Sequence, residues 1–286
     1  FDAAGNLLSR NDYLQSVSEA FVYDDMNRLV DAGVNLGNGD VRNTSVSYDA
    51  LGNIFSKTGV GSYTYGGTCN SVVAGPHAVT GITSPRSASY CYDANGNMLS
   101  GDGRSIQYSY FDKPLVIERD DVETTLKYGP DYVRYKRIDK KGGATTRHTY
   151  AGPYEKIDLP NGDVEERHTI GGYALVTIKN RGQSTAGTQN THYLHHDHLG
   201  SLTALTDAST GAVVERFSFD PWGKRRAIDL TELEGLLDSA WASMTGFEQW
   251  NITLEASLLD SALTNKGYTG HEQLDGVELV HMGGRV

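Results

Sequence analysis

The sequence predicts an all-β protein built mainly from antiparallel hairpins, and three observations favour this fold class. Glycine is abundant, at 33 of 286 residues, or about 12% where ~7% is usual. Tyrosine, at 17 residues, outnumbers phenylalanine and tryptophan together, at 7 and 3. A short phrase that encodes a tight turn also recurs along the chain. These features are typical of many strands joined by tight turns.

The recurring phrase is an aromatic residue and Asp, followed by two residues, Gly or Asn, and a polar residue. Its first three aspartates are 22 and 25 residues apart, and the next interval, from Asp49 to Asp93, is 44 residues. That interval is about two repeats long, and residues 63–67 stand where a degraded copy is expected. The phrase occurs at residues 1–6, 23–28, 48–53, 92–97 and 219–224.

The phrase has the chemistry of a hairpin turn. Asp at the first position of a type I turn accepts hydrogen bonds from backbone N–H groups two residues on. Gly at the fourth position supplies the left-handed backbone that closes a hairpin with the right twist, so we expect positive φ there. Asn is the next most tolerant residue for that conformation, and Pro at the second position has a suitable fixed φ. The turn residues predicted in this way are Asp24, Asn27, Asp49, Gly52, Asp93, Gly96, Asp220, Pro221 and Gly223.

Segments between these turns alternate as strands should, for example at residues 44–48 and 87–92. Two further hairpins are predicted by strong turn signals between strand-like runs. The first is LPNGD at residues 159–163, and the second is DASTG at residues 207–211.

Residues 228–265 break the pattern and predict an α-helical insertion. Thr231 and Glu234 match a capping box. Apolar residues then follow at helical spacing up to Gly246, which would end the first helix, and a weaker helical pattern follows. Helices that cover a sheet edge are a known remedy for exposed strands.

Charge and cysteine content exclude several classes of protein. The net charge is −11 and the isoelectric point about 5.2, which argues against a general nucleic-acid binder or docking on anionic lipid. No stretch approaches the ~18 apolar residues of a membrane span. The chain starts at Phe1 without a signal peptide, so we expect it to be a piece of a longer one. Cys69 and Cys91 leave two alternatives open, one disulfide or two unpaired small hydrophobic residues.

The aromatic-Asp phrases resemble the YD repeats of the Rhs family, and other segments resemble the Rhs-associated core. Residues 75–80 (GPHAVT) and the phrase at 92–97 resemble the repeat region that precedes the core. Residues 281–286 (HMGGRV) fall where family members continue toward the end of the core. The core-like segments are YGPD at 128–131, RYKR at 134–137, YLHHDHLGS at 193–201, FDPWG at 219–223 and GYTGHEQLD at 267–275.

This resemblance implies a strip of β-hairpins that spirals into a large hollow shell. In bacterial toxin relatives such a shell encloses a C-terminal toxin domain, and eukaryotic teneurins carry a similar shell at the cell surface. From it we expect four segments in this chain. They are YD-repeat hairpins at 1–127, Rhs-core strands at 128–227, the helical insertion at 228–265 and a truncated C-terminal part of the core at 266–286.

Four histidines close together raise the hypothesis of a metal site, since imidazoles suit zinc. His192, His195, His196 and His198 lie on one expected strand, which spreads them over about 20 Å at ~3.3 Å per residue. Only His196 and His198 would readily share an ion. We therefore interpret the histidines as part of a motif that shapes the shell, and we expect no metal and no cofactor.

No catalytic residue is predicted. His271, Glu272 and His281 lack the His-Glu-x-x-His spacing of zinc proteases, and there is no Gly-x-Ser-x-Gly elbow or phosphate-binding glycine loop. In many toxin relatives a self-cleaving aspartyl protease site ends the core. The resemblance places those aspartates beyond Val286, so we expect this chain not to be an enzyme.

The resemblance therefore implies a structural shell fragment of a bacterial polymorphic toxin, which encapsulates and delivers a C-terminal toxin domain. The alternative is an extracellular carbohydrate-binding or adhesion module of a teneurin-like surface protein. The expected partners are the toxin domain of the same polypeptide and the remaining shell repeats, with secretion machinery or cell-surface carbohydrate as further candidates. No nucleic acid and no membrane span are expected, and the expected location is secreted or at the cell surface.

Overall fold

The computed structural model describes residues 1–13, 16–35, 41–180, 187–226 and 263–282. Regular structure in these ranges consists of β-strands with antiparallel pairing and of short 3-10 turns. The prediction of an all-β, mainly antiparallel fold is confirmed. The helical insertion predicted for 228–265 lies outside the described residues, except for its last three positions, which are not helical.

The chain divides into two compact units. Among the described residues, the first unit contains 1–102 and the second contains 103–226 with 263–282. The finer division into 1–127, 128–227, 228–265 and 266–286 stays a prediction.

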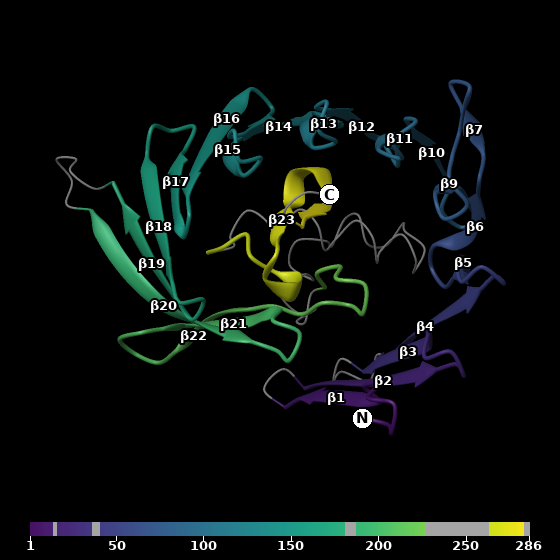
Figure 1. Cartoon of the computed structure of the whole chain (residues 1–286). Helices are drawn as coiled ribbons and strands as arrows, with labels where there is room; N and C mark the ends of the chain where they lie inside the picture. Colours follow the sequence, from purple (N-terminus) through teal and green to yellow (C-terminus); the bar gives the residue numbers. More distant parts are fainter. Residues whose placement is uncertain (14–15, 36–40, 181–186, 227–262, 283–286) are drawn as a thin grey trace, which may run out of the picture. The chain divides into compact units, whose positions relative to one another are not determined.

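The first unit is a strip in which each strand pairs with the next, from β1 to β6 and then through β9 to β11 (Figure 1). The pairing passes directly from β6 to β9 because β7 and β8 pair only with each other. The strands are β1 (Ser9–Asp12), β2 (Val17–Tyr23), β3 (Leu29–Asn35), β4 (Val41–Tyr48), β5 (Ile54–Lys57), β6 (Gly61–Tyr65), β7 (Thr68–Cys69), β8 (Val72–Val73), β9 (Val79–Thr83), β10 (Ala88–Tyr92) and β11 (Met98–Gly101).

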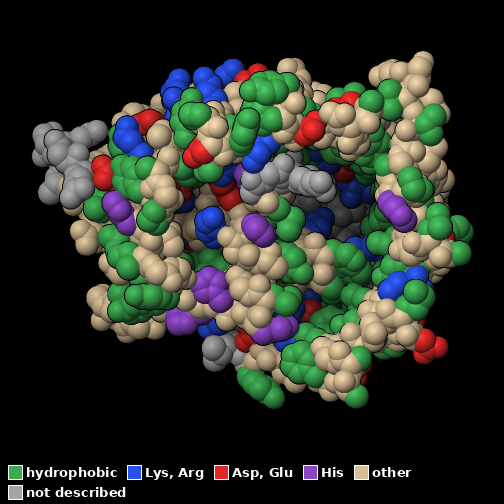
Figure 2. All heavy atoms as spheres, in the orientation of Figure 1, with side chains coloured by type: hydrophobic (Ala, Val, Ile, Leu, Met, Phe, Trp, Pro, Cys, Tyr) green, Lys and Arg blue, Asp and Glu red, His purple; other side chains and the backbone are tan. Residues whose placement is uncertain are grey.

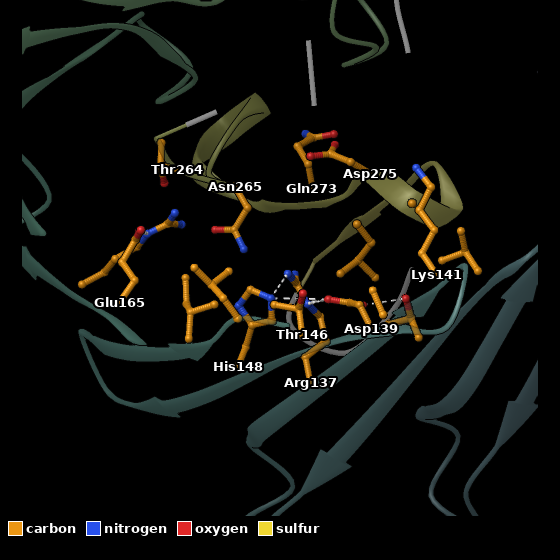
Figure 3. A pocket seen from close by; sticks show the side chains of 18 residues that line it. Arg137, Asp139, Lys141, Thr146, His148, Glu165, Thr264, Asn265, Gln273 and Asp275 are labelled. Carbon is orange, nitrogen blue, oxygen red and sulfur yellow. Dashed lines mark hydrogen bonds and ion pairs between the residues drawn. The ribbon is translucent and has the colours of Figure 1, made fainter. Parts of the chain in front are cut away.

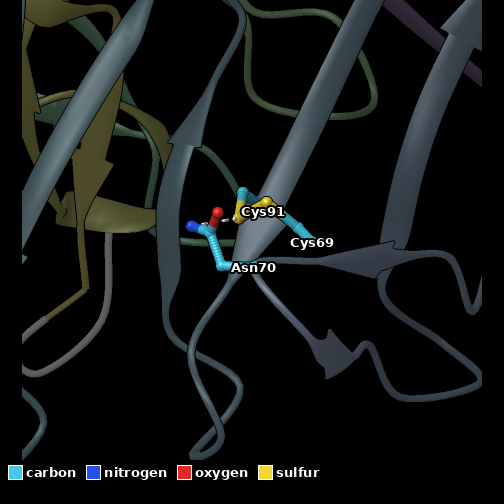
Figure 4. The surroundings of a disulfide bond; sticks show 3 residues. All are labelled: Cys69, Asn70 and Cys91. Carbon is cyan, nitrogen blue, oxygen red and sulfur yellow. Dashed lines mark hydrogen bonds between the residues drawn. A yellow bond between two sulfur atoms is a disulfide. The ribbon is translucent and has the colours of Figure 1, made fainter.

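A disulfide joins the β7–β8 hairpin to the strip. Cys69 of β7 is bonded to Cys91 of β10, with their Cα atoms 5.4 Å apart (Figure 4). The Asn70 amide lies beside the bond and donates to Cys91 Sγ at 3.7 Å. Of the two alternatives that the sequence leaves open for the cysteines, the structure therefore contains the bridge.

The second unit is a longer strip in which β12 to β22 pair in order. The hairpins predicted around 159–163 and 207–211 are confirmed, because they join β17 to β18 and β21 to β22. The strands are β12 (Arg104–Tyr108), β13 (Pro114–Arg119), β14 (Val122–Tyr128), β15 (Arg134–Lys141), β16 (Ala144–Ala151), β17 (Tyr154–Asp158), β18 (Val164–Ile170), β19 (Ala174–Lys179), β20 (Thr188–His196), β21 (Leu202–Asp207) and β22 (Val213–Arg216).

Residues 263–282, which we call the C-terminal segment, cross the concave side of the second strip (Figure 1, yellow). Its η3 turn contacts β13 and β14, while its η2 turn contacts β21 near the other end of the strip. The segment therefore reaches strands that are far apart in the pairing order. Its elements are η2 (Tyr268–Gly270), β23 (Glu272–Leu274), η3 (Asp275–Val277) and β24 (Leu279–His281), and β23 pairs with β24.

The buried core of the second unit lies between the strip and this segment. Val277 of η3 is fully buried where η3 contacts β13 and β14, and Ile117 and Leu126 of those strands are also buried. At the other end, Tyr268 of η2 packs against a buried cluster formed by Leu175, Leu202, Leu205, Phe217 and Phe219.

Candidate functional site

One backbone turn recurs throughout the described residues. The N–H of its first residue donates to the carbonyl of the fifth, and the N–H of the fourth donates to the carbonyl of the first. The fourth residue always has positive φ, including 85° at both Gly52 and Gly96, which confirms the expectation for these two glycines. The described turns of this kind begin at Asp2, Asp24, Asp49, Asp93, Ser109, Gly129, Leu159, Asp197, Asp220 and Gly267.

Where Asp is the first residue of the turn, its carboxylate accepts hydrogen bonds from backbone N–H groups of the same turn. Asp49 Oδ1 accepts from the N–H groups of Leu51 and Asn53 at 2.9 and 2.8 Å. Asp220 Oδ1 does the same with Trp222 and Lys224. The same pair of bonds is made by Asp2, Asp24, Asp93 and Asp197.

At Asp24 and Asp49 these bonds favour the ionised carboxylate. At Asp24, the largest cause is a hydrogen bond from the Arg28 side chain, which together with backbone donors lowers the carboxyl pKa. At Asp49, partial burial acts to raise the pKa, but the bonds from Asn53 and the turn backbone outweigh it and lower the pKa. The charge of Asp24 and that of Asp49 thus each stabilise the turn that contains them.

The tyrosine that precedes Asp makes a second repeated contact, which the sequence did not reveal. Its hydroxyl donates to a backbone carbonyl of an earlier hairpin, and for Tyr23, Tyr48 and Tyr65 the acceptor lies five positions after the first residue of the preceding turn. Tyr65 belongs to the degraded copy and keeps the contact although its Asp is absent. The bonds run from Tyr23 to Leu7 (3.2 Å), Tyr48 to Leu29 (2.7 Å), Tyr65 to Ile54 (2.8 Å) and Tyr92 to Val79 (2.8 Å).

The candidate metal ligands His196 and His198 flank the turn aspartate Asp197 and are exposed. Figure 2 shows histidine side chains at the surface over β20 and β21. His195 Nε2 lies 2.9 Å from Thr206 Oγ1, and His192 is buried. Among the described residues, no group of three His, Cys, Asp or Glu side chains could hold a metal ion. The interpretation of the histidines as a shell-shaping motif stays a prediction.

A buried charge cluster in the second unit is the most elaborate side-chain arrangement described. Its centre is Glu272 of β23, which is only 4% exposed. Its carboxylate forms ion pairs with Arg134 and Arg137 of β15. It also accepts hydrogen bonds from the Tyr150 hydroxyl at 2.8 Å and from Asn265 Nδ2 at 2.7 Å. Glu272 thereby attaches the C-terminal segment to β15 and β16.

The cluster extends from Arg137 along the strip. Arg137 Nε donates to Asp139 Oδ2 at 2.8 Å, and its Nη2 lies 2.8 Å from His148 Nε2. His148 Nδ1 lies 2.8 Å from Glu155 Oε1. Burial acts to raise the pKa of Asp139, but hydrogen bonding to His148 and the Arg137 charge outweigh it and lower the pKa to about 2. Burial raises the pKa of Tyr150 to about 12, so its hydroxyl stays a donor.

A cavity of about 310 Å³ adjoins this cluster. Arg137, Asp139 and His148 form part of its strand-side wall, and Asn265, Gln273 and Asp275 line it from the C-terminal segment (Figure 3). Burial raises the pKa of Asp275. The charged residues Arg137, Asp139 and His148 of the strand-side wall thus already bind one another.

Further contacts fix the C-terminal segment at both ends. Arg104 Nε donates to the Val277 carbonyl at 2.7 Å, and Glu278 forms ion pairs with Arg104 and Arg119. At the other end, Leu202 N–H donates to the Gly267 carbonyl, and the Tyr268 hydroxyl donates to the Pro221 carbonyl. Every contact described here binds the segment to the strip, so attachment is the chemistry that this arrangement supports.

The sequence does not reveal the roles of Arg134, Arg137 and Glu272. Arg134 and Arg137 were part of a core-like string, and Glu272 was weighed only as a partner of His271. Asp197 was missed as a turn residue because His196 stands where the phrase has an aromatic residue. A search for Asp-x-x-Gly alone would have found that turn.

Comparisons with known proteins add one weak structural likeness. No family model matches the sequence, and no curated protein matches it. Among solved structures, the chain is similar to a crystal structure of TcdB2-TccC3 without the hypervariable C-terminal region, at 14% identity and a TM-score of 0.41. The match covers 94% of this chain and 16% of that one, and so weak a likeness carries no argument. In the part of the chain that the structure describes, no helix is long and apolar enough to cross a membrane.

Proposed function

We propose that this chain is a segment of an Rhs-type shell that encloses and delivers a C-terminal toxin domain. One observation carries the proposal, namely the repetition of a single turn and its tyrosine contact along a strip of consecutive hairpins. Units of this kind are each joined to their neighbours in the series, so a strip can extend by adding units. Such a construction suits the wall of a container better than it suits a compact catalytic domain.

The proposal includes the absence of catalysis. The turn aspartates are engaged with backbone donors, and the Glu272 cluster is engaged in holding the C-terminal segment. A nucleophile, a base and an orienting group at mutual hydrogen-bond reach would be needed for an enzyme site. Secretion or surface exposure belongs to the same proposal.

Limited proteolysis tests containment. The polypeptide to use is this chain joined to the remaining shell and a C-terminal toxin domain, with the isolated toxin domain as control. We expect the enclosed domain to be digested at least about tenfold more slowly than the free domain, because cleavage would require opening of the shell. Digestion at equal rates would refute containment.

Two further measurements test the absence of catalysis and the adhesion alternative. The intact mass of the purified chain should stay constant over days of incubation, and a defined self-cleavage product that vanishes on replacement of one Asp would refute the non-enzyme proposal. On a glycan array the chain should bind nothing saturably, and selective binding of one glycan would favour the adhesion alternative.

A further inference from the structure

Two buried donors on neighbouring strands have no hydrogen-bond partner among the described residues. They are the Tyr128 hydroxyl and Arg134 Nη1. Tyr128 of β14 and Arg134 of β15 stand directly opposite each other in the strand register. A buried polar group without a partner costs about 1–3 kcal/mol, and native proteins nearly always provide one. Two such donors on residues that are register partners can therefore be satisfied by one shared acceptor.

Arg134 is held rigidly enough to present its free nitrogen. Its Nη2 binds Glu272, and its guanidinium lies over the Tyr150 ring, with Cζ 4.6 Å from the ring centroid. The side chain is only 10% exposed. Burial raises the pKa of Tyr128 to about 12, so the Tyr128 hydroxyl keeps its proton and can donate. The site is thus built before any ligand arrives, which reduces the ordering cost of binding.

Charged side chains of both signs surround the two donors. Lys113 Nζ lies 5.4 Å from the centre of the Tyr128 ring, and Arg137 shares Glu272 with Arg134. Asp139 is engaged by Arg137. Glu155 and Lys266 also act on the charge of Arg134, so the preference for an anion comes from the two donors, which need an acceptor.

His281, which lies within electrostatic reach of Arg134 and Lys113, adds no further charge. Burial lowers the pKa of His281 to about 4, so the ring is neutral at neutral pH.

A surface pocket adjoins the Arg134 side chain. Arg134 lines a surface pocket together with the Gly129 turn, Tyr135 and the end of β16 at Tyr150 and Ala151. Asp131 also lines this pocket, but its Oδ1 already accepts the Val133 N–H at 3.1 Å. The pocket brings a small group up to the Arg134 side chain, and contact with the buried Tyr128 hydroxyl, which does not line the pocket, requires the side chains between them to move.

We propose that Tyr128 and Arg134 bind an oxyanion of the carboxylate type, with one oxygen accepting from the Tyr128 hydroxyl and one from Arg134 Nη1. Charge-assisted hydrogen bonds of this kind are the strong ones, and the arginine fork suits a carboxylate. This site does not depend on the shell proposal and would remain if the chain enclosed nothing. Its ligand is either a carboxylate of a polypeptide or a small free oxyanion.

The test uses acetate as the probe and the purified 286-residue chain. Chloride is replaced stepwise by acetate at constant ionic strength and neutral pH, so that screening does not change, and the thermal unfolding midpoint is recorded. Binding to the folded state alone should raise the midpoint along a saturation curve. A midpoint that does not respond, or that rises without saturating, would overturn the proposal.

Tyr128→Phe is the decisive variant, because the hydroxyl that it removes bonds to nothing in the described structure and the fold should survive. We expect its apparent affinity for acetate to fall about tenfold, the effect of losing one hydrogen bond to a charged group. Tyr48→Phe is the matched control, since it loses a hydroxyl bonded to the Leu29 carbonyl in the other unit. It should keep the acetate response unchanged. An equal response in Tyr128→Phe and the wild type would also overturn the proposal.

Peptide probes then distinguish the two sources. A short peptide with a free C-terminal carboxylate is compared with its amidated form and with inorganic phosphate. Tighter binding of the free peptide than of acetate would support a polypeptide ligand. Equal or tighter binding of phosphate or acetate would support a small free oxyanion, and loss of the difference between free and amidated peptide would count against the carboxylate contact.

Discussion

Both units use the same turn, but the contacts that stabilise each unit internally span very different distances in sequence. In the first unit, the tyrosine contacts join residues 11 to 19 positions apart. In the second, the contacts of Glu272 with β15 and β16 span 122 to 138 positions. The first unit is therefore a chain of repeats that each contact repeats nearby in sequence, whereas the second depends on a remote segment. A substitution that removes one contact should therefore destabilise mainly the neighbouring strands in the first unit, but strands far apart in the second.

Loss of Glu272 should have the largest effect. Glu272→Ala leaves Arg134 and Arg137 buried without their shared carboxylate, and removal of one partner of a buried ion pair costs about 3–5 kcal/mol. Denaturant unfolding gives the loss of stability, and hydrogen exchange should show residues 263–282 losing protection first. Glu123→Gln, at an exposed pair with Lys140, is the control and should cost less than about 1 kcal/mol. Similar losses in both variants would mean that the segment is not anchored by Glu272.

Removal of the disulfide should come next and should act on the first unit alone. Cys69 and Cys91 are 22 positions apart, and closing a loop of this length stabilises by about 3 kcal/mol in the chain-entropy model. The double replacement by Ala should lower the free energy of unfolding by this order. Reductant should destabilise the wild type and leave the double variant unchanged. If reductant destabilises both equally, the bridge is not the cause.

The left-handed turn position should have a moderate effect. Gly96 has φ of 85° and open space where a Cβ would be, so Gly96→Val tests backbone conformation without a clash. We expect a cost of about 1–3 kcal/mol, more than for Asn97→Ser. Gly75→Val is the matched control, because a Cβ there also meets open space and φ is not left-handed. Equal costs at 75 and 96, measured by thermal unfolding, would contradict the turn argument.

The tyrosine contacts should give the smallest effect. Tyr48→Phe removes one hydrogen bond to a backbone carbonyl and should cost about 1 kcal/mol, with Tyr65→Phe similar in size. Tyr13→Phe, at a side chain that is 88% exposed, should change nothing measurable. Equal stability of all three variants and the wild type would show that the repeated contact does not hold successive hairpins together.

The sequence predicted the fold class and the Asp turns because both depend on local chemistry. Asp at the first position and Gly at the fourth act within five residues, so a phrase is enough to find them. The turns that begin at Ser109 and Gly129 escaped this search, since Asp112 and Tyr132 hold the left-handed position that the phrase assigns to Gly or Asn.

The candidate site could not be predicted from the sequence for a different reason. Arg134 and Glu272 meet across 138 positions, and only the path of the C-terminal segment brings them together. The burial that makes their pairing strong is likewise a tertiary property. Histidine spacing, which was visible in the sequence, drew attention to His196 and His198, whereas the structure brings its charges together around Glu272.

The passage of the strip from β6 directly to β9 has a practical consequence for engineering. Tyr65 pairs with Val79 in register and still bonds to Ile54, so the ladder closes beneath the β7–β8 hairpin. Asn70 and Ser71 at the tip of that hairpin have left-handed backbones, and the disulfide holds Cys69, the residue next to this tip, to β10. Asn70 and Ser71 are exposed, so a foreign peptide inserted between them should leave the β6–β9 register unchanged. The hairpin tip is therefore a suitable position for inserting a peptide.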